Sequence, residues 1–177
     1  MKHLLITGKP GVGKTTLIRE MALRLTNYDP VGFYTGEIRV NGYREGFRLV
    51  SLDGQSGILS HVDQPGPYRV GRYGVDLAGF ERFLNELDLV HSPSQLVILD
   101  EIGKMECLST QFTTVLETLL NSSKLIIATI ALRGEGFIQQ VKQRPDCRLF
   151  SVTVENREGL VDTMMAELLQ QLGTQEK

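Results

Sequence analysis

The stretch LLITGKPGVGKTTLIREM, Leu4 to Met21, decides how the rest of the sequence is interpreted. It passes directly from an apolar run into a loop with three glycines, one proline and two lysines. Residues 8–15 of this loop fit the pattern G-x-x-x-x-G-K-[ST]. Glycines let several backbone N–H groups converge on phosphate oxygens, and a following helix points its N-terminal dipole at the same anion. The stretch therefore predicts a polyphosphate-binding loop between a strand and a helix.

The side chains that follow the glycines have separate predicted roles. We expect the Lys14 ammonium to bridge the β- and γ-phosphates and to act in catalysis. We expect the Thr15 hydroxyl to coordinate Mg²⁺ and the Thr16 hydroxyl to reach the α-phosphate. The residues predicted to contact phosphate are Gly8, Lys9, Pro10, Gly11, Val12, Gly13, Lys14, Thr15 and Thr16.

A second candidate site lies at the end of the apolar run LVILDE, where Asp100 and Glu101 follow four buried-type residues. Carboxylates in that position are costly unless a cation or hydrogen bonds meet them. A Mg²⁺ ion beside the phosphate loop would meet Asp100. Glu101 would then orient or deprotonate the water that attacks the γ-phosphate, although the two acids could exchange roles. This pair favours hydrolysis over transfer, because a kinase must exclude water.

Apolar periodicity predicts an α/β fold with a mainly parallel sheet covered by helices on both faces. Strands are expected at 2–7, 95–101, 124–132 and 147–154, and helices at 13–26, 77–87, after 109, at 136–142 and around 161–172. Residues 31–62 read as an antiparallel meander with turns at Asn41-Gly42 and Asp53-Gly54. Residues 63–74 read as a loop, and Asp76 as the cap of the next helix. We expect one domain over residues 1–172 and a frayed tail at 173–177.

Composition excludes some classes of protein. The chain has 177 residues, 41% of them hydrophobic, and a formal net charge of −2, so nothing attracts it generally to nucleic acid or to an anionic membrane. The two cysteines are predicted to be free thiols in a reducing compartment. The N-terminal apolar run is too short for a signal peptide, and no later run is long enough for a membrane span. We expect a cytoplasmic protein without nucleic-acid or membrane partners; the sequence indicates no particular protein partner.

Several segments together resemble the small THEP-type nucleoside-triphosphatases. They are GKPGVGKTTL, VGFYTGEIRVNGYREGF, SLDGQ, GRYGVD, LVILDEIGKME and VTVENR, and they occur in the same order from Met1 to about Leu172. The resemblance implies a P-loop NTPase fold of the RecA-like kind. It also implies Mg²⁺-dependent hydrolysis of ATP, GTP and other nucleoside triphosphates, such as CTP and UTP, to the diphosphate and phosphate, with loose base selectivity.

The same resemblance implies that residues 8–15 and a second segment contact the nucleotide. That segment consists of Leu99, Asp100, Glu101, Ile102, Gly103, Lys104, Met105 and Glu106. From the residues alone, Lys104 and Glu106 are either polar groups near the γ-phosphate or parts of a surface turn.

Other polar residues have both a functional and a structural interpretation. Arg72 and Arg133 are candidates to stabilise transition-state charge, or are solvated surface groups. Glu37, Arg39 and Arg44 are expected to form cross-strand ion pairs in the meander. Asn156-Arg157 would contact the base or cap the last helix. The three histidines share no spacing that indicates a metal site.

Three functions remain open on the sequence. The leading one is a nucleoside-triphosphatase. The second is a nucleotide or small-molecule kinase, which would need an acceptor pocket and usually an arginine-rich lid; no arginine-rich segment is present. The third is a nucleotide-switched binding module whose meander would carry a partner.

Overall fold

The computed structural model describes residues 2–173, without the side chains of residues 172 and 173. Its elements follow one another in this order: β1 (His3–Gly8), α1 (Lys14–Arg24), the 3₁₀ turn η1 (Thr26–Tyr28), β2 (Val31–Val40), β3 (Tyr43–Ser51), β4 (Ser56–His61), β5 (Arg69–Val70), β6 (Tyr73–Val75), α2 (Leu77–Leu87), β7 (Leu96–Ile102), the 3₁₀ turn η2 (Glu106–Leu108), α3 (Thr110–Asn121), β8 (Leu125–Ile130), α4 (Phe137–Lys142), β9 (Cys147–Val152) and α5 (Arg157–Gly173). Of the expected frayed tail at 173–177, Gly173 is the last residue of α5, and residues 174–177 lie outside the described residues.

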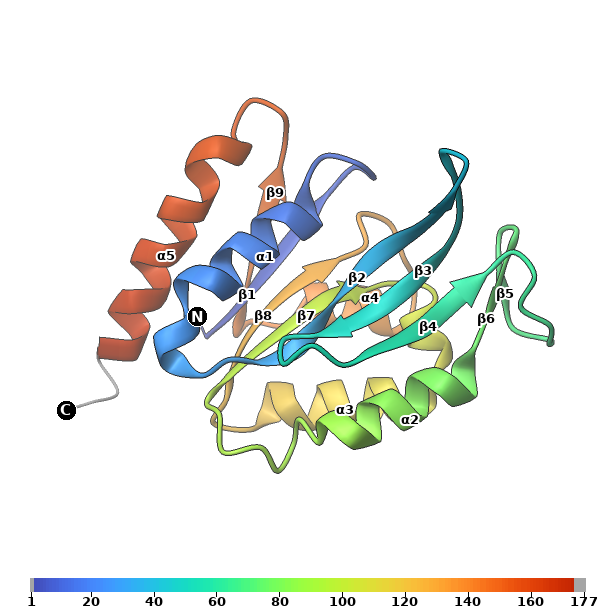
Figure 1. Cartoon of the computed structure of the whole chain (residues 1–177). Helices are drawn as coiled ribbons and strands as arrows, with labels where there is room; N and C mark the ends of the chain where they lie inside the picture. The colour runs from blue at the N-terminus through green and yellow to red at the C-terminus, as the bar shows by residue number, and fades with distance from the viewer. Residues whose placement is uncertain (1, 174–177) are drawn as a thin grey trace.

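Within residues 2–173 the strands form one sheet in the order β5-β6-β4-β3-β2-β7-β8-β1-β9 (Figure 1). The strands from β2 to β9 in this order pair in parallel, which confirms the predicted parallel core. The strands from β2 to β5 pair antiparallel. The meander is therefore an extension of the same sheet, and β2 belongs to both halves.

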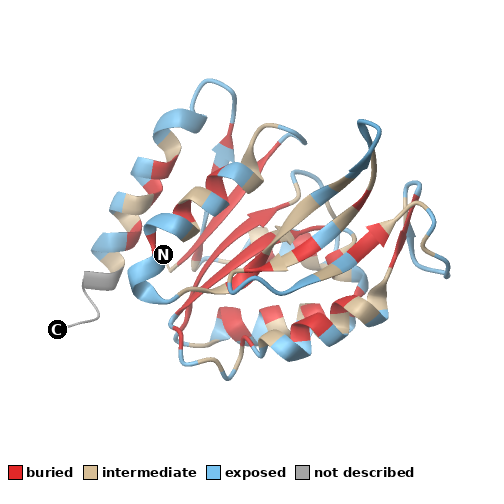
Figure 2. Cartoon of the chain, in the orientation of Figure 1, coloured by how far each residue is buried: buried red, intermediate tan, exposed pale blue. Residues whose placement is uncertain are grey.

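Helices cover both faces of the parallel core, as expected. Helices α1 and α5 lie side by side on one face, and α2 and α3 lie on the other (Figure 1). The first pair packs on side chains such as Leu4, Ile6 and Ile98, and the second on alternating ones such as Val97 and Leu99. Figure 2 shows the central strands buried along their length, and α1, α2, α3 and α5 buried mainly on the side that faces the sheet. Alternation along buried strands thus sets which side chains can meet at each face.

The junction between the two halves of the sheet depends on Gly32 in β2. Its φ is 138°, and a Cβ placed there would lie 1.8 Å from the carbonyl oxygen of Ile98 in β7. Only glycine lets the two backbones approach this closely. This contact brings the start of the meander alongside the strand that carries the two predicted carboxylates.

Most local predictions are confirmed, and one is wrong. Asn41 and Gly42 both have positive φ in the β2–β3 turn, and Asp76 Oδ1 accepts a hydrogen bond from Gly79 N at 3.0 Å as the cap of α2. Residues 63–74 are not only a loop, because they contain β5 and the start of β6. This short hairpin forms because β6 pairs with the edge of β4, a long-range contact with no local sequence signal.

Among residues 2–173, no helix combines the length and hydropathy needed to cross a bilayer.

Candidate functional site

The loop between β1 and α1 has the geometry that phosphate binding requires. Gly11 and Gly13 have φ values of 76° and 107°, in the region that favours glycine, and α1 begins immediately after Gly13. The Lys14 ammonium lies 3.3 Å from the carbonyl oxygen of Gly8 and so folds back over the loop. Lys9, Pro10 and Gly11 are exposed at the tip. A loop of this shape before a helix N-terminus, with an ammonium beside it, is of the kind that binds phosphate in other proteins.

Asp100 is the centre of the hydrogen-bond network beside this loop. Its side chain is buried at the end of β7 and accepts a bond from Thr15 Oγ1 at 2.8 Å. It also accepts bonds from Thr35 N and Oγ1 at 3.3 and 3.2 Å, and from Thr129 Oγ1 at 2.5 Å. Four elements, α1, β2, β7 and β8, therefore meet at one carboxylate. These contacts supply the hydrogen bonds that a buried carboxylate needs.

Thr35 and Thr129 were not among the residues predicted from the sequence. Thr129 interrupts the apolar strand LIIATI at its carboxyl end, the same signal that drew attention to Asp100. Thr35 gave no separate signal, because its position opposite β7 depends on the long-range pairing of β2 with β7.

Glu101 lies beside Asp100 but faces a different environment. It is half-buried, and the peptide bond that joins the two acids is cis. Burial is the main cause that raises the pKa of Glu101, and the negative charge of Asp100 raises it further. The positive charges of Lys14 and Lys142 lower it, but the net shift is upward. Lys142, another residue absent from the predictions, is held by a 2.9 Å bond from its ammonium to the Leu132 carbonyl. The Glu101 carboxyl is thus poised to take up a proton more readily than a solvated glutamate does.

The turn after β7 holds a buried acid. Glu106 is 5% exposed, and burial raises its pKa to about 8, with the charges of Glu101 and Asp100 adding to the effect. The structure therefore excludes the surface-turn interpretation for Glu106. Lys104 is exposed in the same turn, and Met105 packs against the core.

A pocket of about 200 Å³ lies next to this turn. It is lined by Thr35, Phe47, Leu59, Val70, Glu101, Gly103, Lys104, Met105, Glu106 and Ala131. Its lining residues come from β2, β3, β4 and β5, from the end of β7, and from the segments after β7 and β8. Glu101 borders it, whereas no residue of the phosphate loop does.

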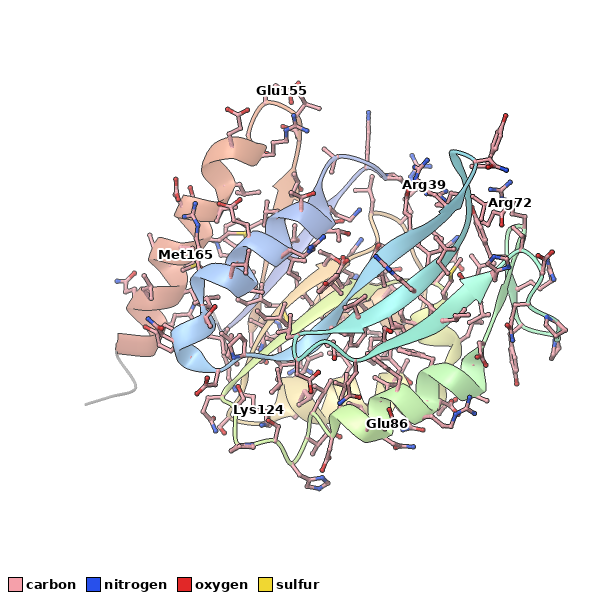
Figure 3. The ribbon with its side chains drawn as sticks, viewed as in Figure 1. Arg39, Arg72, Glu86, Lys124, Glu155 and Met165 are labelled. Atoms are coloured by element: carbon pink, nitrogen blue, oxygen red, sulfur yellow. The ribbon has the colours of Figure 1, made fainter. Side chains whose placement is uncertain are left out.

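Several predicted residues lie away from this centre. The side chains of Leu99 and Ile102 are both buried in the same core cluster. Strict alternation would place them on opposite faces of β7, but the pairing of β7 with β8 shifts register between these two residues. Arg72 lies in the β5–β6 hairpin, where it donates to the Arg44 carbonyl and stacks over Tyr73 (Figure 3). Three strands separate β6 from β7 in the sheet, so Arg72 lies in the antiparallel half, away from the carboxylates on β7. Arg133 is exposed in the loop after β8.

Two further predictions concern structural roles. Glu37 on β2 accepts a bond from Arg44 Nη1 on β3 at 2.9 Å, which confirms a cross-strand ion pair. It also accepts a bond from Arg39 Nε at 2.7 Å, within β2. Asn156 donates to Ser151 O and accepts from Thr153 N, both at 2.8 Å, so its side chain orders the turn before α5.

The fold and the loop together define an α/β protein of the phosphate-loop class. A family model described as NTPase matches residues 3–165, and the chain belongs to this family. It is 43% identical over 166 residues to nucleoside-triphosphatase THEP1 of Thermotoga maritima, covering 93% of this chain and 94% of the relative. It is 40% identical over 176 residues to the human cancer-related nucleoside-triphosphatase, covering 90% and 93%.

Solved structures agree with the family assignment. The crystal structure of THEP1 from Aquifex aeolicus superposes with a TM-score of 0.87 at 30% identity, covering 94% of this chain and 98% of that one. The solution structure of the human protein gives a TM-score of 0.78 at 36% identity, covering 94% and 96%. The relation to THEP-type proteins indicated by the sequence is therefore confirmed.

Proposed function

We propose that this chain is a Mg²⁺-dependent nucleoside-triphosphatase that releases phosphate from ATP, GTP and other nucleoside triphosphates. The observation that carries the proposal is the bond from Thr15 on the phosphate loop to Asp100 on β7, with Lys14 and Glu101 beside it. The names of the relatives, which are nucleoside-triphosphatases, support the reaction class.

The residues present fit a magnesium ion. Thr15 Oγ1 and Asp100 Oδ2 lie 2.8 Å apart, and both are hard oxygen donors of the kind that Mg²⁺ prefers. Mg²⁺ usually takes few protein ligands and completes its shell with water and substrate phosphates. When bound, the ion would neutralise charge that develops on the phosphate oxygens.

The other residues of the site have separate roles in the proposed reaction. Backbone N–H groups of the loop and the Lys14 ammonium bind the phosphates and hold the γ-phosphoryl group at the mouth of the loop. Glu101 orients a water molecule and takes its proton, and its raised pKa suits a base that works near neutral pH. Thr35 and Thr129 hold the Asp100 carboxylate in place and keep it from turning away from Thr15.

Loose base selectivity is part of the proposal, supported by the phosphate-centred arrangement of the residues above. The test compares turnover of ATP, GTP, CTP and UTP, each with Mg²⁺ and with EDTA. We expect similar turnover of all four with Mg²⁺ and loss of turnover with EDTA. Strong preference for one base, or turnover that survives EDTA, would contradict it.

The proposal also includes a cytoplasmic location. The two cysteines, Cys107 and Cys147, are free thiols, which is typical of a reducing compartment and supports this location.

A further inference from the structure

The 200 Å³ pocket beside Glu101 has no role in the proposed hydrolysis. At about 30 Å³ per water molecule, it holds on the order of seven waters, the space of one ring with a short substituent. Its apolar lining consists of Phe47, Leu59, Val70, Met105 and Ala131. A pocket that only channelled water to Glu101 would not need this apolar surface.

Phe47, the aromatic residue of the pocket lining, is held in place by neighbouring side chains. The ring of Phe47 packs edge-on against Tyr73, with centroids 5.5 Å apart, and the Arg44 guanidinium lies 5.0 Å from the Phe47 centroid. Arg44 Nε in turn donates to the Tyr73 hydroxyl at 3.0 Å. Phe47 therefore has a fixed position in the pocket wall, so that little side-chain entropy would be lost there when a ring binds.

The pocket also has polar lining side chains, which are those of Thr35, Glu101, Lys104 and Glu106. Thr35, which bonds to Asp100, borders the pocket together with Glu101. Glu106 is buried, and because burial raises its pKa to about 8 it is mostly uncharged at neutral pH. An uncharged carboxyl favours a neutral polar partner over an ion. The pocket thus combines an apolar body with neutral polar groups, apart from the proposed base Glu101 and the solvent-exposed Lys104.

We propose that this pocket binds a small, uncharged organic alcohol and presents its hydroxyl to Glu101 as an alternative acceptor of the γ-phosphoryl group. The proposal rests on the proposed function, because the donor is the triphosphate on the phosphate loop. The alcohol oxygen bonds to the γ-phosphorus while the bond from that phosphorus to the β–γ bridging oxygen breaks. The electron pair leaves with the nucleoside diphosphate, and the hydroxyl proton passes to Glu101. The products are a phosphate monoester and the diphosphate.

Benzyl alcohol is the probe, and benzyl methyl ether, which lacks the hydroxyl, is its matched control. Reactions with ATP and Mg²⁺ are followed by ³¹P NMR, which separates benzyl phosphate from inorganic phosphate. A ring of this size is expected to bind only in the millimolar range. We expect benzyl phosphate with the alcohol and none with the ether, and methyl shifts at Leu59, Val70 and Met105 with both.

Val70→Phe fills the pocket from β5, and Ile58→Phe adds the same ring to an exposed position on β4. We expect Val70→Phe to lower ester formation at least tenfold while phosphate release stays within twofold, and Ile58→Phe to change neither. Phosphate release without ester, or without methyl shifts, overturns the acceptor site and leaves the proposed hydrolysis intact. If the wild-type protein did not turn over nucleotide at all, the proposed function itself would be overturned. If the probe shifted methyl signals only outside the pocket, the proposed acceptor site would be overturned.

Discussion

At the scale of single residues, the site depends on one buried carboxylate. Asp100 collects bonds from Thr15, Thr35 and Thr129, which come from three different elements. Removing one hydrogen-bond partner of a buried charged group leaves part of the desolvation cost of that group uncompensated. The same network that fixes Asp100 therefore also fixes the phosphate loop relative to the end of the sheet.

Replacing Lys14 with alanine should abolish tight triphosphate binding. The ammonium is the cation held nearest the loop, and charge-assisted bonds of this kind contribute about 1.5–3 kcal/mol, which corresponds to a loss of roughly tenfold or more in affinity. Calorimetry with a non-hydrolysable ATP analogue measures this. Arg82→Ala is the matched control, because Arg82 is an exposed cation on α2, outside the phosphate loop. Unchanged affinity in Lys14→Ala would refute the assignment.

Glu101→Gln should keep nucleotide affinity and lower turnover by a factor of roughly 10² or more, because the amide cannot take the proton of the attacking water. Phosphate release and calorimetry are measured on the same preparation. Glu86, exposed on α2 away from the sheet (Figure 3), offers the control Glu86→Gln with unchanged turnover. Wild-type turnover in Glu101→Gln would move the role of the base to another residue.

The buried Glu106 should make the folded state less stable as the pH rises. Its pKa is 4.5 in an unfolded chain and about 8 when folded, so between these values the folded state holds a proton that the unfolded state has lost. Stability is therefore greatest below pH 4.5 with respect to this group and falls until about pH 8. The whole window is worth on the order of 5 kcal/mol, at about 1.4 kcal/mol per pH unit.

Urea denaturation of the nucleotide-free protein from pH 5 to pH 9 measures this effect. Glu106→Gln should flatten the pH dependence, because the amide stays neutral throughout. Parallel curves for wild type and variant would show that Glu106 is ionised in the folded protein.

At the scale of elements, the contact between β2 and β7 joins the meander to the nucleotide site. Gly32→Ala should destabilise the fold by about 3 kcal/mol or more, because its Cβ would overlap the Ile98 carbonyl and its φ is positive. Gly57→Ala in β4 is the control, since its Cβ would meet only Phe83 at 3.8 Å. Chemical denaturation of both variants measures their free energies of unfolding. Equal values for the two variants would show that the close contact between β2 and β7 does not constrain the fold.

Elements with strong local signals were predictable from the sequence. The phosphate loop, the strand that ends in Asp100, and the helix capped by Asp76 each follow from residues close together in the chain. The β5–β6 hairpin was not predictable, because its partner β4 supplies the pairing. Thr35 and the burial of Glu106 were missed for the same reason, since both depend on segments that are distant in sequence.

At the scale of the whole molecule, one continuous sheet places two different surfaces beside the same strand. The parallel half carries the phosphate loop, and the antiparallel half walls the pocket on the other side of Glu101. The carboxyl ends of parallel strands form the usual ligand-binding edge of such sheets, and here the meander encloses that edge further. Nucleotide and pocket are thus expected to meet at Glu101.

The most direct test of this account is a crystal structure with a non-hydrolysable triphosphate analogue and Mg²⁺. We expect the phosphates within the loop formed by residues 8–15 and the ion next to Thr15 and Asp100. A water molecule between the γ-phosphate and Glu101 completes the expected arrangement. Density for the analogue at another place, or Asp100 and Glu101 turned away from the γ-phosphate, would contradict the account.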